Sequence, residues 1–427
     1  MVGASLALAL GDTGVSTVLI EGTAPDAQVQ PSFDDRTTAL GNASRRIFQA
    51  LGVWPDIAPE AAPIRTIHVS DAGRFGVARL RAQEQGIDAF GYVVANRVIG
   101  KALWRKLEIT KGLTLRVPAT PETVQITEQG VRLTVVPTDR RGGAASRESA
   151  DPQPNSQRSL GVPEEISARL VVAADGAHSS VRAAAGIEAD VEDYDQVAIV
   201  ANIGADKPQE GTAYERFTPS GPLALLPLFD GSFGVVWTAK PDRAKELLAA
   251  PDADFLRELQ SRFGWRAGRF VRVGRRASYP LKLSRAATTV ATRTVLIGNA
   301  AQALHPVAGQ GFNLGLRDAA MLAEVVANAA HGATRPGGAA LSPARDPGSP
   351  ELLRQFSEWR GADRTGVTRF TDGLVKLFGD TRLGVGTLRN LGLLLFDLTP
   401  PAKSALARVS AGFGGPTPRL ARGLQVR

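Results

Sequence analysis

Residues 294–318 read TVLIGNAAQALHPVAGQGFNLGLRD, and this stretch decides the predicted fold. Residues 295–297 form a short apolar run that is typical of a buried strand. A loop rich in glycine and proline follows, and apolar residues then recur at helical spacing from residue 314 to about residue 329, with Asn313 as the predicted N-cap. Glycines let the backbone approach a ligand, and a helix N-terminus favours negative charge. The stretch predicts a site for an electron-rich ligand; taken alone, it also fits an ordinary strand–loop–helix crossover.

A second informative stretch lies at residues 3–21, GASLALALGDTGVSTVLIE. A small-residue helix, a turn and a predicted buried strand at residues 15–21 end in Glu21, which corresponds to the second part of a βαβ nucleotide-binding unit. In that unit the terminal acid accepts hydrogen bonds from ribose hydroxyls, although Glu21 alone would also suit a solvated strand end. The first strand of that unit and the first two glycines of G-x-G-x-x-G are missing, so Gly3 can only be the third glycine. Our hypothesis is therefore that the true start lies upstream and Met1 is an internal methionine, which the in-frame codons before Met1 would test.

A third stretch places Asp175 and Gly176 after a predicted strand and before a helix start. Asp175 could hold a ribose or orient a phosphate-binding arginine, but Asp-Gly is also a common turn. Arg36 lies in the polar loop at residues 31–46 and is a candidate phosphate contact. Arg97 lies in the first turn of a helix predicted at residues 96–109, where a cation opposes the helix dipole unless it has an anionic partner. The alternative for both arginines is a solvent-facing side chain.

The rest of the chain divides by composition. Residues 190–285 contain several predicted strands, with Asp230-Gly231 as a hairpin signal, and indicate a separate sheet that could cover a pocket. Residues 138–165 are polar, lack aromatic residues and are predicted to be a disordered insertion. The C-terminal region is predicted to be helical, with an apolar run at residues 391–396 beside a basic tail. That pairing suits peripheral membrane contact and a core-packing helix equally well.

Composition excludes several classes of function. The 427 residues contain no cysteine, and the four histidines do not pair at a metal-ligand spacing, so we predict no metal. The net charge is +8 with a pI of about 10.0, but the basic residues are scattered, which favours an anionic membrane surface over nucleic acid. No apolar run approaches the roughly 18 residues of a membrane span. The first basic residue is Arg36, too late for a signal peptide, so we expect a cytoplasmic chain.

Together the three stretches resemble the three FAD motifs of class A flavin monooxygenases. The segments SFDDRTTAL (residues 32–40), GYVVANRVI (residues 91–99) and LHPVAGQGFNLGLRD (residues 304–318) resemble more narrowly the FAD-dependent hydroxylases of ubiquinone biosynthesis, in particular the group of 2-polyprenyl-6-methoxyphenol hydroxylases. The resemblance covers nearly the whole chain except residues 138–165.

The resemblance implies an α/β fold in which a Rossmann-like FAD-binding domain (residues 1–63, 91–189 and 286–330) carries an inserted mixed β-sheet substrate domain (residues 64–90 and 190–285) and C-terminal helices (residues 331–427). It implies FAD as cofactor, NAD(P)H and O2 as co-substrates, and a polyprenylphenol substrate. It also implies peripheral contact with the inner membrane or a ubiquinone-biosynthesis complex. The alternatives are a related flavin monooxygenase for another aromatic or isoprenoid substrate, and a truncated, non-catalytic protein that binds a membrane or a complex.

The resemblance also assigns site residues by motif position. His305 is the candidate for catalysis, although its proline neighbour favours a structural role as readily. Asn299 stands where many related flavoenzymes carry aspartate. The predicted FAD-binding residues are Gly3, Glu21, Arg36, Arg97, Asp175, Gly298, Asn299, Pro306, Gly309, Gln310, Gly311, Phe312 and Asn313.

Overall fold

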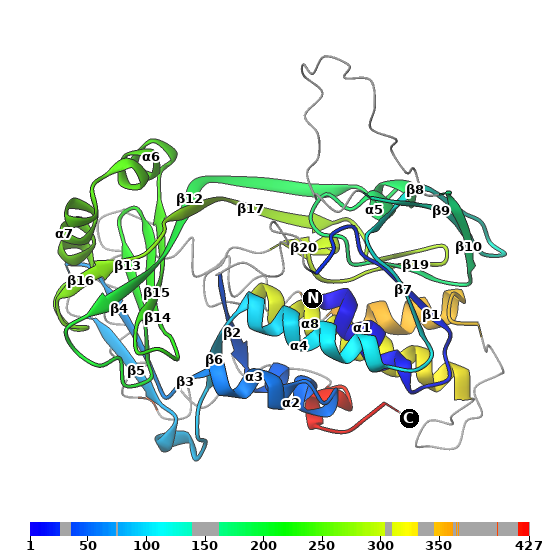
Figure 1. Cartoon of the computed structure of the whole chain (residues 1–427), viewed down its shortest axis with the longest axis horizontal. Helices are drawn as coiled ribbons and strands as arrows, with labels where there is room; N and C mark the ends of the chain where they lie inside the picture. The colour runs from blue at the N-terminus through cyan, green and yellow to red at the C-terminus, as the bar shows by residue number, and fades with distance from the viewer. Residues whose placement is uncertain are drawn as a thin grey trace, which may run out of the picture.

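The computed structural model describes residues 1–25, 36–73, 76–138, 162–303, 310–331, 346–361, 364, 366, 399 and 417–426. The chain folds as a mixed α/β protein. Helices α1, α2, α3, α4 and α8 gather on one side, a large sheet with α6 and α7 stands at the other, and two long strands, β12 and β17, run between them (Figure 1). The predicted helices at residues 391–396 and in most of the C-terminal region lie outside the described residues.

The helical half contains two short parallel strand pairs. Strand β1 (Thr17–Ile20) pairs with β7 (Leu113–Arg116), and β11 (Val171–Ala173) pairs with β19 (Thr294–Leu296), which pairs in turn with β18 (Val290–Ala291). The main helices are α1 (Val2–Gly11), α2 (Asn42–Ala50), α3 (Trp54–Ile57), α4 (Asn96–Ile109), α5 (Ser180–Ala184) and α8 (Gln310–His331). Helices α1, α2, α4 and α8 share one apolar core. The strand predicted at residues 15–21 is present as β1, but the prediction that it is buried is wrong, because the residues of β1 are half-buried or exposed.

The large sheet has the order β20-β17-β12-β15-β14-β13-β4-β5, and β16 pairs with β12. Two distant segments build it, because β4 pairs in parallel with β13 across about 145 residues of sequence. Its strands are β4 (Thr66–Asp71), β5 (Val77–Arg81), β12 (Ala189–Ala205), β13 (Thr212–Thr218), β14 (Gly221–Pro227), β15 (Phe233–Ala239), β16 (Phe270–Val273), β17 (Ala277–Ala286) and β20 (Gln302–Ala303).

Alternation along these strands gives the large sheet two different faces. The outer face packs on α6 (Pro241–Ala249) and α7 (Asp252–Phe263) through Ile199, Leu223 and Trp237. The inner face packs on a three-stranded sheet of β2 (Thr37–Gly41), β6 (Gly91–Ala95) and β3 (Ala62–Ile64). The large sheet therefore forms a wall beside the helical half.

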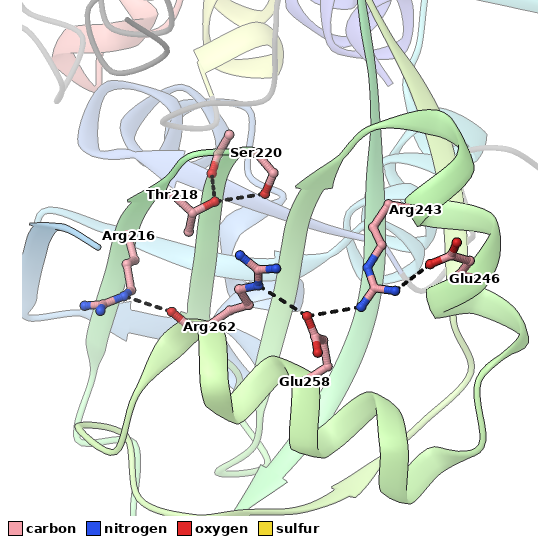
Figure 2. A network of polar contacts seen from close by, with 8 residues as sticks. Arg216, Thr218, Ser220, Arg243, Glu246, Glu258 and Arg262 are labelled. Carbon is pink, nitrogen blue, oxygen red and sulfur yellow. Dashed lines mark hydrogen bonds and ion pairs between the residues drawn. The ribbon is translucent and has the colours of Figure 1, made fainter. Parts of the chain in front are cut away.

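Figure 2 shows a polar network on the outer face, which joins α6 and α7 to β13. The side chain of Arg216 donates to the carbonyl oxygen of Arg262 at 3.0 Å, and Glu258 pairs with both Arg262 and Arg243 at 3.2 and 3.1 Å. Exposed ion pairs of this kind contribute about 0–1 kcal/mol each, so apolar packing rather than this network holds the helices to the sheet.

Two sequence expectations are wrong in detail. Strand β10 (Glu164–Ala168) begins inside the predicted insertion and extends the hairpin of β8 (Ala119–Ile126) and β9 (Val131–Pro137). Residues 139–161 of that insertion lie outside the described residues. Helix α8 begins at Gln310, so Asn313 is inside its first turn and is not the N-cap.

His68 is a buried histidine on the outer face of the large sheet. It is 5% exposed, lies beside the ring of Tyr214, and its Nε2 contacts the guanidinium of Arg266. Burial, together with the positive charges of Arg266 and Arg79, lowers the pKa of His68 to about 4. The imidazole is therefore neutral at pH 7.

This pKa links protein stability to pH. In the unfolded chain His68 takes up a proton below about pH 6.5, whereas the folded protein takes it up only near pH 4, so stability is lost as pH falls through that window. We expect His68→Gln to reduce the loss in free energy of unfolding between pH 6.5 and 4.5 by roughly 2 kcal/mol. Urea unfolding at the two pH values measures it. His178→Gln, at an exposed histidine, is the control; equal pH dependence in the wild type and His68→Gln would contradict the assignment.

Candidate functional site

A cavity of the helical half lies between β1 and β11, which do not pair with each other. It has a volume of about 1030 Å³ and is lined by residues of β1, β11 and α1. Strand β1 is hydrogen-bonded on one side only, to β7, and β11 on one side only, to β19. Among the described strands, none fills the gap between these two edges.

Glu21 lines this cavity at the end of β1. Its backbone N–H donates to the carbonyl oxygen of Arg116 at 3.0 Å, which fixes the strand end, and its Oε1 accepts from the N–H of Thr23 at 3.1 Å. Gly3 lines the same cavity from α1, where an added Cβ would lie 3.0 Å from the side chain of Ala174. The absence of a side chain at Gly3 therefore lets α1 pass close to the end of β11.

Asp175 reaches the cavity from the opposite strand. Its Oδ2 accepts from the N–H of Ser180 at 2.9 Å, at the start of α5. Asp175 is exposed, so its carboxylate has room for a further partner. His178 also lines the cavity and is exposed. The structure thus brings together residues of two sequence motifs: Gly3 and Glu21 from residues 3–21, and Asp175 from the Asp-Gly motif.

The remaining motif, at residues 294–318, begins at β19, whose end lies close to the start of α1. Gly298 adopts a φ of +57°, in the left-handed region that favours glycine, and an added Cβ there would meet Val2 at 3.3 Å. Gly315 of α8 faces the same point, since its Cβ would lie 2.9 Å from the Cα of Gly298. Two glycines therefore let α1, α8 and the end of β19 meet. Asn299 follows in a short 3-10 turn (Gly298–Ala300) and is exposed.

Asp318 ties this junction to the C-terminal helical residues. It is completely buried and accepts from the N–H of Gly298 at 3.3 Å. Its two oxygens pair with Arg360 at 2.8 Å and with Arg364 at 3.1 Å, and both arginines are also buried. A buried carboxylate with two guanidinium partners and a backbone donor is a structural contact, because it leaves no oxygen directed at a ligand.

Asn313 has a comparable structural role in the first turn of α8. Its Oδ1 accepts from the N–H of Gly41 at 2.8 Å and from the hydroxyl of Ser44 at 2.6 Å, while its Nδ2 donates to the carbonyl oxygen of Ala39 at 2.8 Å. The side chain that was expected to cap α8 instead joins α8 to β2 and α2.

The two predicted arginines lie apart from the cavity. Arg97 pairs with Glu60 at 3.2 Å, and both side chains are about one-third exposed, so this anionic partner leaves the guanidinium accessible. The guanidinium of Arg36 lies 4.8 Å from the ring centre of Tyr279, which extends from the inner face of β17. Arg36 therefore lies between the helical half and the wall formed by the large sheet.

The remaining predicted residues fall at residues 305–312 of the sequence. His305, Pro306 and Gly309 lie outside the described residues. Gln310, Gly311 and Phe312 form the first turn of α8, and the Oε1 of Gln310 is buried without a hydrogen bond. An unsatisfied acceptor at a helix start is costly, so this turn has an incomplete polar environment.

One acid that the sequence analysis did not select lies on the inner face of the large sheet. Glu215 pairs in register with Val69 of β4 and Ala224 of β14. Ala224 lies on the same face of the sheet as Gly234, where an added Cβ would lie near the hydroxyl of Thr37 on β2. This contact with β2 identifies the face as the inner one. Burial raises the pKa of Glu215 to about 7. Alternation within residues 212–218 indicates that Glu215 lies on the face opposite to Tyr214 and Arg216. The sequence alone does not indicate which of these two faces is the inner one.

The residues around the cavity fit the adenosine end of a dinucleotide cofactor. An acid at a strand end, a glycine on the neighbouring helix and the N-terminus of α1 are arranged as in a βαβ nucleotide site. Among the described residues, no group of three or more histidine, aspartate or glutamate side chains could hold a metal ion. No helix in the described part of the chain is long and apolar enough to span a bilayer.

Comparison with known proteins gives consistent results. The family model described as "FAD binding domain" matches residues 1–340. Ubiquinone hydroxylase UbiL of Rhodospirillum rubrum is 36% identical over 99% of this chain and 91% of its own length. The 3-demethoxyubiquinol 3-hydroxylase of Escherichia coli is 31% identical over 96% of both chains. The crystal structure of p-nitrophenol 4-monooxygenase from Pseudomonas putida covers 97% of this chain and 96% of its own, with a TM-score of 0.72 and 20% identity, and so supports the fold.

The buried position of Asp318 makes a stability prediction. Asp318→Asn keeps the shape of the side chain but removes the counter-charge of Arg360 and Arg364, so we expect a loss of about 3–5 kcal/mol in the free energy of unfolding. Urea denaturation measures it. Glu165→Gln is the control, because its ion pair with Arg132 is exposed on both sides and should cost under about 1 kcal/mol. A loss as small as that of the control would exclude a structural role for Asp318.

Proposed function

Because the chain belongs to the FAD binding domain family and is an FAD-dependent monooxygenase, we propose that it hydroxylates the ring of a polyprenylated phenol in ubiquinone biosynthesis. The observation that carries the proposal is similarity along the whole chain, at 36% and 31% identity, to two hydroxylases named for ubiquinone compounds. The family identified from the three motifs is therefore confirmed, and the substrate class is the proposal.

In this proposal the adenosine end of FAD lies at the ends of β1 and β11, where Glu21, Gly3 and Asp175 come together. Glu21 would accept hydrogen bonds from the ribose, and Gly3 would leave room for the cofactor beside α1. Asp175 would contact the cofactor from the opposite strand. When bound, FAD supplies the redox chemistry, in which electrons from NAD(P)H activate O2 for transfer of one oxygen atom to the substrate.

The flavin end would lie toward the start of α8 and the inner face of the large sheet. Gly298, Asn299 and the first turn of α8 lie at that junction, and Arg36 lies across from them beside Tyr279. The positive end of the α8 dipole would stabilise negative charge on the cofactor. The predicted contacts of Arg97, His305, Pro306 and Gly309 with FAD remain part of the proposal.

The inner face of the large sheet is apolar, and its Ile67, Ala213 and Leu226 pack against β3 and β6. We propose that apolar residues of this face outside that packed cluster contact the prenyl chain. We propose likewise that residues 64–90 and 190–285 form the substrate domain, against an FAD domain of residues 1–63, 91–189 and 286–330. The positive net charge supports, in addition, peripheral contact with an anionic membrane that contains the polyprenyl substrate.

The proposed cofactor contact is testable by binding. Glu21→Ala removes the carboxylate that would accept from the ribose, and a lost charged hydrogen bond costs about 1.5–3 kcal/mol, which is roughly a tenfold to hundredfold weaker affinity for FAD. Titration of the apoprotein with FAD, followed by flavin fluorescence, gives the affinity. Glu122→Ala, at an exposed acid on β8, is the control. Unchanged affinity in Glu21→Ala would remove Glu21 from the site.

The proposed activity is tested with the FAD-loaded protein, NAD(P)H and 2-geranylphenol as a short-chain substrate. We expect a product that carries one oxygen atom from isotopically labelled O2, detected by mass spectrometry. The same reaction with phenols that lack a prenyl chain should be slower, because the apolar inner face contributes to binding. Labelled product from other aromatic compounds alone would contradict the substrate class, and no labelled product from any phenol would contradict the activity.

A further inference from the structure

Residues 262–276, which run from the last turn of α7 through β16 to the start of β17, are strongly basic. They contain six arginines and no aspartate or glutamate. This concentration departs from the scattered distribution of basic residues over the rest of the chain. Helix α7 and β16 pack together at one end of the molecule, on the far side of the large sheet from α8 (Figure 1). The segment therefore places positive charge at that end.

Only half of these arginines have a carboxylate partner. Three of them form ion pairs at 3.0–3.8 Å, namely Arg262–Glu258, Arg269–Asp206 and Arg276–Asp252. Within the described ranges, no ion pair involves Arg266, Arg272 or Arg275, and all three are exposed. Arg266 contacts the imidazole of His68, which is neutral at pH 7. Six arginines against three carboxylates leave an excess of three positive charges.

Large apolar side chains lie among these charges. Trp265, in the loop between α7 and β16, is 67% exposed, and Val271 of β16 is 52% exposed. Apolar residues that are exposed singly are normal on a protein surface. Here an indole, a strand valine and three guanidinium groups without a carboxylate partner occur within eleven residues of sequence, 265–275. The surface is therefore both apolar and cationic.

The loop that presents Trp265 is held by a buried side chain. Gln260 is 8% exposed, and its Nε2 donates to the carbonyl oxygens of Gly264 and Gly268 at 2.6 and 3.1 Å. Its Oε1 accepts from the N–H of Phe270 at 2.8 Å. Both glycines have φ angles of +86° to +87°, which favour glycine over other residues. An indole that stays in solvent on a loop fixed in this way has the arrangement expected for contact with an external partner.

We propose that residues 264–276 form a docking surface for a membrane with anionic lipid headgroups. The choice of a bilayer rests on the proposed function, because a polyprenylated phenol partitions into one. Indole rings favour the boundary between headgroups and acyl chains, where the apolar body and the N–H group are both accommodated. Guanidinium groups pair well with phosphates and are attracted to an anionic surface. A soluble polyanion would pair with the same arginines, but it offers no apolar layer to Val271.

The first test is co-sedimentation of the full chain with vesicles of phosphatidylcholine, with and without phosphatidylglycerol. Wild type should bind the mixed vesicles more tightly, and added salt should weaken that binding. Arg272→Gln combined with Arg275→Gln should bind roughly 20-fold more weakly, since each basic residue near an anionic surface contributes about a factor of five. Lys101→Gln combined with Arg105→Gln removes two exposed charges from α4, and this control should bind like the wild type.

The second test uses Trp265 as its own probe. Mixed vesicles should shift its fluorescence to shorter wavelength, and lipids brominated in their acyl chains should quench it. Trp265→Ser should lose this quenching and bind about tenfold more weakly, because it removes apolar surface from the interface. Ile109→Ser removes a side chain of α4 that is 72% exposed, and this control should retain both signals.

The outcomes are distinct. Wild type that binds both kinds of vesicle equally, or neither, overturns the inference, and so does an arginine variant that binds like the wild type. Binding to poly(U) or polyglutamate but to no vesicle also overturns it and identifies a surface for a soluble polyanion. Hydroxylation of dissolved 2-geranylphenol should be equal in wild type and variants. Docking through these residues without hydroxylation of any prenylphenol would support the surface and contradict the proposed function.

Discussion

The buried charge of Asp318 is the constraint on which the candidate site depends. A carboxylate with no access to water must be matched, and here two guanidinium groups and the N–H of Gly298 match it. The match is possible only because Gly298 and Gly315 lack side chains, which lets the end of β19 approach α8. Strand end, helix and C-terminal helical residues are therefore fixed by one electrostatic requirement, and the space between β1 and β11 takes its shape from the elements so fixed.

Strand β13 shows how one strand can create two chemical environments. On its outer face Tyr214 and Arg216 lie beside His68 of β4, whose imidazole is kept neutral by burial and, to a smaller extent, by nearby positive charge. On its inner face Glu215 meets apolar neighbours, and burial keeps the acid protonated up to about neutral pH. Both groups lose charge for the same reason, the cost of burial in a medium of low polarity, although one is a base and the other an acid. The different environments of the polar residues on this strand thus result from the alternation of its side chains between two faces, and not from a local sequence motif.

Much of the fold could be predicted from the sequence, because short-range patterns set it. The apolar run at residues 295–297 and the helical spacing after it identify β19 and α8, and the small residues at 3–10 identify α1. The side chain of Asn313 could not be assigned, because its partners Gly41 and Ser44 lie about 270 residues earlier in the chain. Glu215 was missed for a related reason, since the face that it occupies depends on pairing with β4 and β14. The period of a sequence pattern shows that the side chains of a strand alternate between two faces, but it does not show which face is turned toward the site.

The parallel pairing of β4 with β13 across about 145 residues of sequence constrains the order in which the fold can form. Strand pairs that are distant in sequence form slowly, because the entropy of closing a long loop is lost before the new contacts compensate for it. During synthesis β4 and β5 are made long before β13, so their hairpin has an unpaired edge until β13 is available. We therefore expect completion of the large sheet to be a slow step of folding, and a chain that stops before residue 212 to present this edge to other molecules.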